Sequence, residues 1–460
     1  MISASLKSKL NRDGWLAILA TLAVAIYFWR FSRYGLQMGA THDDLMNLGR
    51  AIRDSYSGLL GDIVCLWRFS PSFRPLGGLF YLGLYDWFGF QPAAFRATCL
   101  TLMAANLVLI FWFARLMANR EIAFFTVLLL AYKTGWPDLY SNTGYCYDLL
   151  CFPLYFGALL VYFRARLAGR LLTTGELAAF VALVWLGLNT KEMIVSVPAV
   201  VGGAELFWLD RKAPLLRRLA PAVIASAAVL LFLFGRLYSP EGLGKMAAYT
   251  PDFSTGQFLK QGRRFLIEFF SLPGDFPGWL LLAMFAALLA AAFWRPSIRA
   301  KVATAIALLG VLPVIFIPNR GLAAAYIPSA GLALLIGSVL ISMARKQAAL
   351  VFLVAFAGLW YIAVRNPPNI PERRAQADEV QRATDGIRAL DLHPPRDARI
   401  LMERDPIPSF RWASTFLFWI LFDDPTISVD WVSEPEPGQE SYQHYAVLTT
   451  TPDGRIVRVR

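Results

Sequence analysis

Histidine and cysteine are scarce in this sequence, which has three His and four Cys among 460 residues. The cysteines stand at positions 65, 99, 146 and 151 and form no Cys-x-x-Cys pair. A thiolate metal site or a disulfide framework is therefore not predicted. The sequence also lacks a P-loop and a Gly-x-Gly-x-x-Gly motif before a helix. It therefore gives no indication of a site for a nucleotide-activated substrate.

Charged residues are also few, at 17% of the chain, whereas 57% is hydrophobic. Soluble domains carry about 25% charged residues, so this composition is typical of a membrane protein. The net charge is +12, but the basic residues lie mainly between apolar blocks, which favours a lipid bilayer over nucleic acid as the partner. The apolar segment from Gly14 to Trp29 is followed by Arg30, Phe31 and Arg33, which do not form a signal-peptide cleavage site. We expect this segment to be retained as the first span.

Long apolar blocks predict about eleven transmembrane helices, because one span needs about 20 mostly apolar residues. The predicted spans are residues 14–31, 95–116, 120–135, 148–163, 175–190, 193–209, 219–237, 277–294, 302–318, 325–343 and 347–364. The segment 75–90 is apolar, but it is broken by glycines and contains Asp86. We expect it to form an interfacial or re-entrant helix. Residues 1–364 are therefore predicted to be an all-α polytopic membrane domain.

The positions of Lys and Arg favour a cytoplasmic N-terminus. In that orientation the basic clusters between spans face the cytoplasm, and the short outward loops contain only Lys133, Lys191 and Arg320. We expect the protein to lie in a bacterial inner membrane. Two long loops, at about 32–94 and 238–276, would then face outward. The second contains QFLKQGRRFLIEFF, whose pattern predicts an amphipathic helix on the outer leaflet.

The composition changes after residue 364, where a Pro-rich boundary begins. Helices are predicted at 371–390 and 409–422. Strands are predicted in RDARILMERD, TISVDWV, HYAVLTT and GRIVRVR. Residues 365–460 are therefore expected to form a small soluble α/β domain on the periplasmic side.

Two adjacent carboxylates follow the first span, in the sequence His42, Asp43, Asp44. A carboxylate can act as a general base, and a pair can bind a divalent metal. Aspartate also favours helix N-termini, so either residue can instead cap a helix at 45–56. The two roles can coexist, one for each Asp. No further cluster with ligand spacing accompanies the pair, so metal binding is not favoured and no cofactor is expected.

Other candidates are charges at the ends of apolar runs, because charges at membrane depth usually face a cavity or each other. Lys191 and Glu192 form either part of a site or a local ion pair that ends two short spans. Arg320 is either an interfacial side chain or a phosphate ligand. Asp148 begins a predicted span on the same side as Asp43. The remaining candidates for the substrate pocket are His42, Asp138, Tyr145 and Tyr326. Arg74 is either a contact to a lipid head group or an interfacial anchor.

Four segments resemble, in their order, the GT-C glycosyltransferases, such as the protein O-mannosyltransferases and the lipid A aminoarabinose transferases. They are HDD at 42–44, RPLGGLFYLGLYDWFGF at 74–90, TKE at 190–192 and NRGLAAAYIPSAG at 319–331. This resemblance implies a GT-C-like fold and a polyprenyl-phosphate sugar as donor. It also implies transfer with inversion, at the outer face of the membrane, to a glycan, lipid or protein acceptor.

The resemblance also implies roles for single residues. Asp43 matches the catalytic base of the family, and Asp44 matches its second acidic position. Arg320, Lys191 and Arg74 are candidates to bind the donor phosphate. Two other classes stay open from the sequence: an O-antigen polymerase or ligase, and a transporter or flippase. The chain shows no inverted repeat of the kind that many transporters have.

Overall fold

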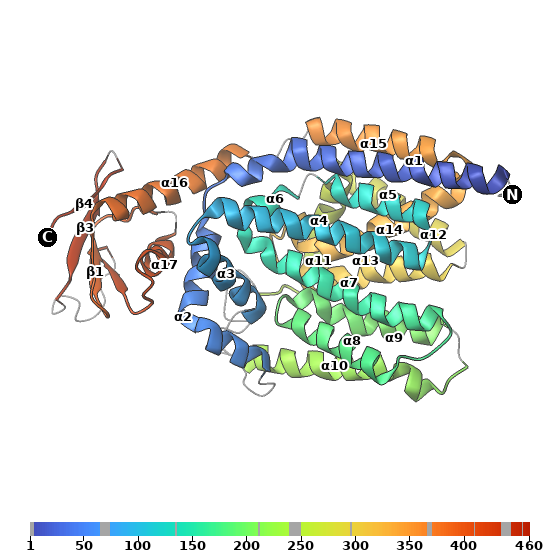
Figure 1. Ribbon diagram of the computed structural model, residues 1–460, viewed down its shortest axis with the longest axis horizontal. Coiled ribbons are helices and arrows are strands. Elements are labelled where there is room, and N and C mark those ends of the chain that lie inside the picture. Colours follow the sequence, from blue (N-terminus) through green and yellow to red (C-terminus); the bar gives the residue numbers. More distant parts are fainter. Residues whose placement is uncertain are drawn as a thin grey trace.

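The chain is described by a computed structural model that covers residues 4–64, 74–133, 136–209, 212–238, 250–294, 297–365, 370–408, 410–433, 443–452 and 454–460. Long helices lie side by side along the long axis of the molecule (Figure 1). The N-terminus lies at one end of this axis and a small sheet lies at the other. This arrangement confirms the predicted fold class, a helical membrane protein with a small α/β region at its C-terminal end.

The helices of the apolar region have the following bounds: α1 Ala4–Tyr27, α2 His42–Val64, α3 Pro75–Phe88, α4 Pro92–Met117, α5 Arg120–Ala131, α6 Pro137–Ser141, α7 Cys146–Leu167, α8 Thr174–Leu188, α9 Val197–Phe207, α10 Leu215–Tyr238, α11 Thr255–Phe270, α12 Gly278–Trp294, α13 Ile298–Ile315, α14 Tyr326–Met343 and α15 Ala348–Arg365. Short π or 3-10 turns extend or join them: η1 Phe28–Ser32, η2 Arg33–Gln37, η3 Thr143–Tyr145, η4 Glu192–Ser196, η6 Leu322–Ala325 and η7 Arg345–Gln347.

A helix lies at each of the eleven positions where a span is predicted. Within the described residues, seven stretches are long and apolar enough to cross a membrane: Gly14–Gln37, Pro92–Met117, Thr143–Leu167, Leu215–Gly235, Ile298–Ile315, Leu322–Met343 and Ala348–Arg365. The other four predicted positions hold the shorter helices α5, α8, α9 and α12, of 12, 15, 11 and 17 residues. The positions of the helices are confirmed, and the exact number of spans stays a prediction.

The segment 75–90 forms helix α3, and its interfacial or re-entrant position in the membrane stays a prediction. It has 14 residues, about 21 Å of helix, which is shorter than the hydrocarbon core of a bilayer at about 30 Å. Pro75 occupies its first turn, where a missing N–H costs nothing, and Arg74 precedes it in a left-handed conformation. α3 packs against α2, and both lie at the end of the helices that faces the sheet (Figure 1).

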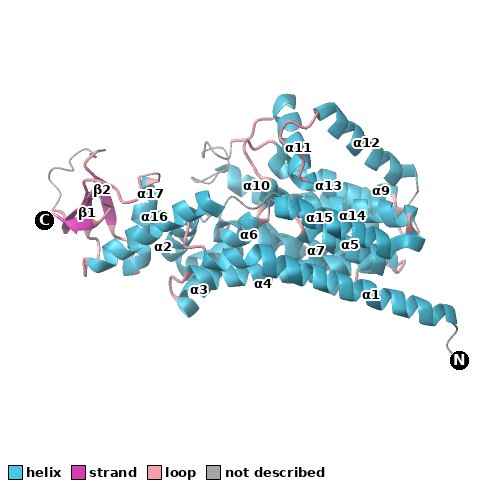
Figure 2. Ribbon diagram, turned by 90° about the horizontal axis from the view of Figure 1, so that it is seen from above, coloured by secondary structure: helices cyan, strands magenta, loops and turns pink. Residues whose placement is uncertain are grey.

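The C-terminal region has all six elements that the sequence predicts. They are α16 Ile370–Ala389, β1 Arg399–Met402, α17 Arg411–Phe422, β2 Ser428–Trp431, β3 Ala446–Thr450 and β4 Ile456–Arg458. The strand order is β2-β1-β3-β4. β1 is parallel to β2 and β3, and β4 is antiparallel to β3. α17 lies between this sheet and α2 (Figure 2), so the C-terminal region contacts the segment that carries the acidic pair.

Candidate functional site

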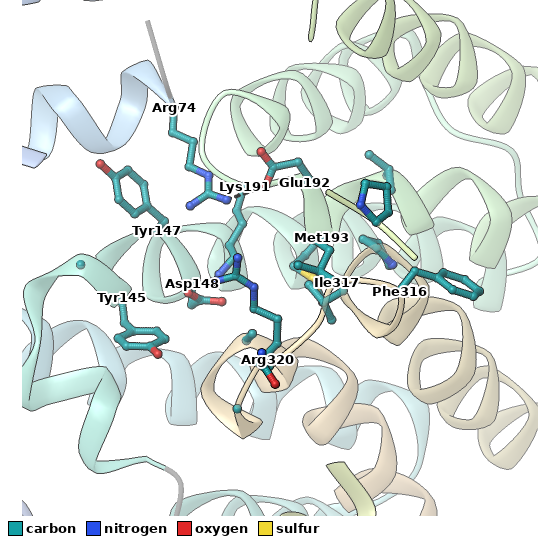
Figure 3. A pocket seen from close by; sticks show the side chains of 18 of the residues that line it. Arg74, Tyr145, Tyr147, Asp148, Lys191, Glu192, Met193, Phe316, Ile317 and Arg320 are labelled. Atoms are coloured by element: carbon teal, nitrogen blue, oxygen red, sulfur yellow. Dashed lines mark hydrogen bonds and ion pairs between the residues drawn. The ribbon is translucent and has the colours of Figure 1, made fainter. Parts of the chain in front are cut away.

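Charged side chains from five segments, among them α2 with Asp43, line one cavity of about 410 Å³ at the end of the membrane helices that faces the sheet. Arg74 comes from the start of α3 and Asp148 from α7. Lys191 and Glu192 come from the turn after α8, and Arg320 comes from the turn before η6. In Figure 3, Arg74 and Arg320 extend toward each other, with Lys191 and Asp148 between them. Asp43 and Tyr145 also line the cavity, so seven predicted site residues meet in one place.

The two adjacent carboxylates have different surroundings. Asp44 is buried, and its Oδ2 accepts hydrogen bonds from the Thr41 N–H at 2.7 Å and the Thr41 hydroxyl at 3.0 Å. It also forms an ion pair with Arg96 of α4, at 2.5 Å between Oδ2 and Nη2. Thr41 and Asp44 together cap the N-terminus of α2, in the pattern of a capping box. Asp44 is therefore the member of the pair that holds the helix in place.

Asp43 instead lines the cavity. Its Oδ2 accepts a hydrogen bond from Asn142 Nδ2 at 2.9 Å. The carboxylate is open to the cavity, but protein surrounds most of it. This desolvation disfavours the charged form and raises the pKa of Asp43 above the ordinary value for Asp. The Asn142 hydrogen bond opposes that increase, while the negative charge of Asp44 adds to it. A carboxylate with a raised pKa is better matched to accept a proton near neutral pH.

Two of the cations of the cavity, Lys191 and Arg74, are paired with carboxylates. Lys191 Nζ donates a hydrogen bond to the carboxylate of Asp148, and both side chains are buried. Arg74 Nη2 lies 2.8 Å from Glu192 Oε2, and its guanidinium lies 5.2 Å from the centre of the Tyr147 ring. These pairs join segments that are far apart in the sequence. They compensate charges that would be costly to bury alone.

Helix α11 fixes the turn that carries Arg320. Gln261 Nε2 donates a hydrogen bond to the carbonyl oxygen of Arg320, and Glu268 Oε2 accepts one from the Leu322 N–H at 2.5 Å. Asn319, just before Arg320, has a left-handed backbone with φ of 59°. The amphipathic helix predicted in the second long loop is thus present, and its polar side chains hold this turn. Its location on the outer leaflet stays a prediction.

A second cavity, of about 610 Å³, lies among α11, α12, α13 and α14. Its lining is almost entirely apolar and includes Phe265, Leu281 and Leu332. Leu312 of α13 lines both cavities, so the apolar cavity adjoins the charged one.

Solved structures share the fold of this chain, although no protein-family model matches the sequence and no curated protein sequence matches it. ArnT from Cupriavidus metallidurans bound to undecaprenyl phosphate superposes with a TM-score of 0.54 at 14% identity, over 96% of this chain and 93% of that one. Its apo state gives 0.52 at 16% identity, over 96% and 94%. The chain has the GT-C fold.

The archaeal oligosaccharyltransferase AglB from Archaeoglobus fulgidus, in complex with an inhibitory peptide and a dolichol-phosphate, shows the same GT-C fold with a TM-score of 0.51 at 12% identity. The match covers 90% of this chain and 64% of AglB, so the chain spans less than two thirds of the length of the archaeal protein.

Not every predicted site residue lines the charged cavity. Tyr145 does. His42 instead lies against Glu379 of α16, Asp138 pairs with Arg373 of α16, and neither lines the cavity as described. Tyr326 is also outside that lining. Its buried ring packs against Trp136 and Phe152, at 5.0 and 4.6 Å between ring centres.

Arg96 contacts the acidic pair but is not among the residues predicted from the sequence. Its guanidinium is fully buried and contacts Asp44, Thr143 and the carbonyl oxygen of Gly39. The sequence indicates a role for Arg96 in one way only: it is a charge inside the predicted span 95–116, and such a charge is costly unless it is paired. The sequence shows Asn142 only as one polar residue in a polar loop.

A metal site is the remaining question about the acidic pair. Among the residues that the structure describes, no group of three or more His, Cys, Asp or Glu side chains lies close enough to hold a metal ion. Asp44 directs both carboxylate oxygens to protein donors, which leaves Asp43 as the carboxylate of the pair that lines the cavity. The expectation that no metal or cofactor is bound stays a prediction from the sequence.

Proposed function

We propose that this chain is a membrane glycosyltransferase that takes a sugar from a polyprenyl-phosphate donor. The supporting observation is that Asp43 and the cations Arg74, Lys191 and Arg320 line one cavity, which adjoins an apolar cavity at Leu312. Such a donor has an isoprenoid chain, a phosphate and a sugar. It needs an apolar surface, cationic groups and a base, in that order along the molecule.

The phosphate of the donor binds between Arg74, Lys191 and Arg320. Arginine suits this role because its planar guanidinium offers paired donors to phosphate oxygens. Arg74 and Lys191 already have the partners Glu192 and Asp148, so a bound phosphate shares these cations with the carboxylates. The isoprenoid chain occupies the apolar cavity. Polyprenyl phosphates in the ArnT and AglB structures are in keeping with this assignment.

Asp43 is the general base in this proposal. Its carboxylate takes the proton from an acceptor hydroxyl or amine as the acceptor atom attacks the anomeric carbon of the sugar. The bond between that carbon and the phosphate oxygen breaks, and the electron pair leaves with the polyprenyl phosphate. The attack comes from the side opposite the leaving group, so the anomeric centre inverts. The nearby cations stabilise the negative charge on the departing phosphate.

The site lies toward the sheet, and we place that side in the periplasm, with the N-terminus in the cytoplasm of a bacterial cell. The acceptor is then a glycan, a lipid or a protein at the outer face of the inner membrane. A reporter that is active only outside the cytoplasm, fused at Arg460, should be active. Activity of a cytoplasmic reporter at the same residue contradicts this orientation.

The function is tested with purified protein in liposomes that contain polyprenyl-phosphate sugars of different sugar types, together with an envelope extract as acceptor. The proposal expects release of polyprenyl phosphate and transfer of the sugar for at least one donor. Movement of the intact lipid-linked sugar across the bilayer without cleavage points to a flippase instead. Joining of diphosphate-linked oligosaccharides points to an O-antigen polymerase or ligase.

A further inference from the structure

Helix α16 of the C-terminal region contacts both segments that hold Asp43. On one side, Arg373 forms an ion pair with Asp138 of α6 and donates a hydrogen bond to Ser141 Oγ at 3.2 Å. The next residue, Asn142, donates the hydrogen bond that Asp43 accepts. Arg373 therefore holds the short helix α6, which ends at Ser141, directly before the residue that contacts Asp43.

On the other side, Glu379 contacts the first turn of α2. Its Oε2 lies 3.1 Å from His42 Nε2, and His42 directly precedes Asp43. The His42 side chain is 6% exposed, and the ring of Phe410 lies against it with 4.7 Å between ring centres. Imidazole and carboxylate at this distance form a hydrogen bond, with the ring N–H as donor.

One rigid helix makes both contacts. Arg373 and Glu379 are six residues apart, which is about 9 Å along an α-helix. The distance between α6 and the first turn of α2 is therefore set by the length of this piece of α16. Neither residue is in the described lining of the charged cavity, so we argue their effect through His42 and α6.

Further contacts dock the C-terminal region on the same helices. Tyr85 of α3 donates a hydrogen bond to the carbonyl oxygen of Ile420 in α17, at 2.9 Å. α17 also approaches α2 closely at Gly49, where a Cβ atom would lie 2.5 Å from Cδ1 of Phe416. A side chain at this position would force the two helices apart. The C-terminal region is thus held in a defined position relative to Asp43.

We propose that Glu379 and Arg373 are positioning residues, which act through His42 and through the Asp138–Asn142 segment to place the carboxylate of Asp43. This inference rests on the proposed role of Asp43 as the base. It assigns a catalytic purpose to the C-terminal region that does not require that region to bind the substrate. A base displaced by about 1 Å can lose about 100-fold in rate, so small shifts of either segment matter.

The kinetic test compares Glu379→Ala, Arg373→Ala and Glu379→Gln with the control Asp378→Asn. Asp378 is the exposed carboxylate next to Glu379 on the same helix. We expect both alanine variants to lower kcat by about 10- to 100-fold without changing the KM for the donor. Glu379→Gln keeps an oxygen that can accept from His42, so it should retain most of the activity, and Asp378→Asn should behave as the wild type. Unchanged kcat in both alanine variants would overturn the proposal.

A second measurement reads the position of residue 43 without using catalysis. In a Cys65→Ser background, Asp43→Cys is labelled with a membrane-impermeant thiol reagent; Cys99, Cys146 and Cys151 are buried. Adding Glu379→Ala should change the labelling rate at least threefold, whereas adding Asp378→Asn should not. Equal rates would refute the positioning role. A changed rate together with full activity of Asp43→Asn would retain the structural link and reject Asp43 as the base.

Discussion

Arg96 of α4 holds the carboxylate of Asp44 through both of its terminal nitrogens, at 2.5 Å to Oδ2 and 3.2 Å to Oδ1. The guanidinium and carboxylate are buried together at the N-terminus of α2. This contact turns Asp44 away from the charged cavity, and the neighbouring Asp43 is the one that lines it. Asp43 and Asp44 are adjacent in the sequence, but their surroundings differ because Arg96 of another helix binds only Asp44.

Replacing Asp44 by Asn should destabilise the protein. The amide oxygen of the new side chain can still accept hydrogen bonds from Thr41, but Arg96 would remain as a buried charge without a carboxylate. Breaking a buried pair in this way costs about 3–5 kcal/mol, so thermal unfolding in detergent should occur at a clearly lower temperature. The control is Asp54→Asn, which removes a more exposed ion pair with Arg53 on the same helix and should change the Tm little. Equal Tm values for the two variants would mean that the Arg96 contact carries no stability.

Much of the fold could be predicted from the sequence, because the apolar blocks and the alternating strands are local patterns. The helices α3 and α11 and the six C-terminal elements appear where these patterns indicate. The pairing of charges could not be predicted in the same way. Lys191 stands next to Glu192 in the sequence, yet its Nζ reaches Asp148 of α7. Such contacts depend on how helices pack, and a single sequence does not contain that information.

The same limit explains why Asp138 and His42 are predicted to line the substrate pocket but do not line the described cavity. Both are polar residues in outward segments, as a substrate pocket requires. Their partners, Arg373 and Glu379, lie on a helix more than 200 residues later in the chain. The sequence predicts the helix at 371–390 but not where it docks.

Removing single cations should weaken binding of the lipid phosphate. For Arg320→Ala and Lys191→Ala, we expect the Kd for undecaprenyl phosphate to rise by about 10- to 150-fold, since one charge-assisted contact contributes about 1.5–3 kcal/mol. Lys191→Ala also leaves Asp148 without its ammonium partner, so its effect combines two losses. Lys260→Ala, an exposed cation on α11, is the matched control and should bind normally. If Arg320→Ala also keeps the wild-type Kd, the cavity does not hold the phosphate as proposed.

The pH dependence of transfer should report on Asp43. The base must be ionised, so kcat/KM should increase as pH rises through its pKa and then reach a plateau. Burial raises that pKa above the usual value of about 3.9, so the increase should occur at higher pH than for an exposed Asp. Protein stability should depend on pH in the opposite direction. Because the pKa of Asp43 is raised in the folded protein, its protonation stabilises the folded state at low pH, and this stabilisation is lost as pH rises through that pKa. An acidic limb that persists unchanged in Asp43→Asn would assign the titration to another group.

Transfer should not depend on a divalent metal, since the described residues provide no cluster of three ligands around Asp43. Incubation with EDTA, followed by removal of the chelator, should leave the initial rate within about twofold of the untreated protein. Adding Mg²⁺ or Mn²⁺ to the treated protein should then have little effect. A loss of activity that one of these ions restores would show that Asp43 acts together with a metal.

The role of Asp43 as the general base is the central claim, and Asp43→Asn tests it most directly. Asn has nearly the same shape and can occupy the same helical turn, but it cannot take a proton. The measurement is the initial rate of sugar transfer from a polyprenyl-phosphate donor by purified protein, alongside the Kd for undecaprenyl phosphate. We predict an unchanged Kd and a rate lower by about 10²- to 10⁴-fold, the usual contribution of a positioned base. A variant that binds the lipid normally and transfers the sugar at the wild-type rate would contradict the account.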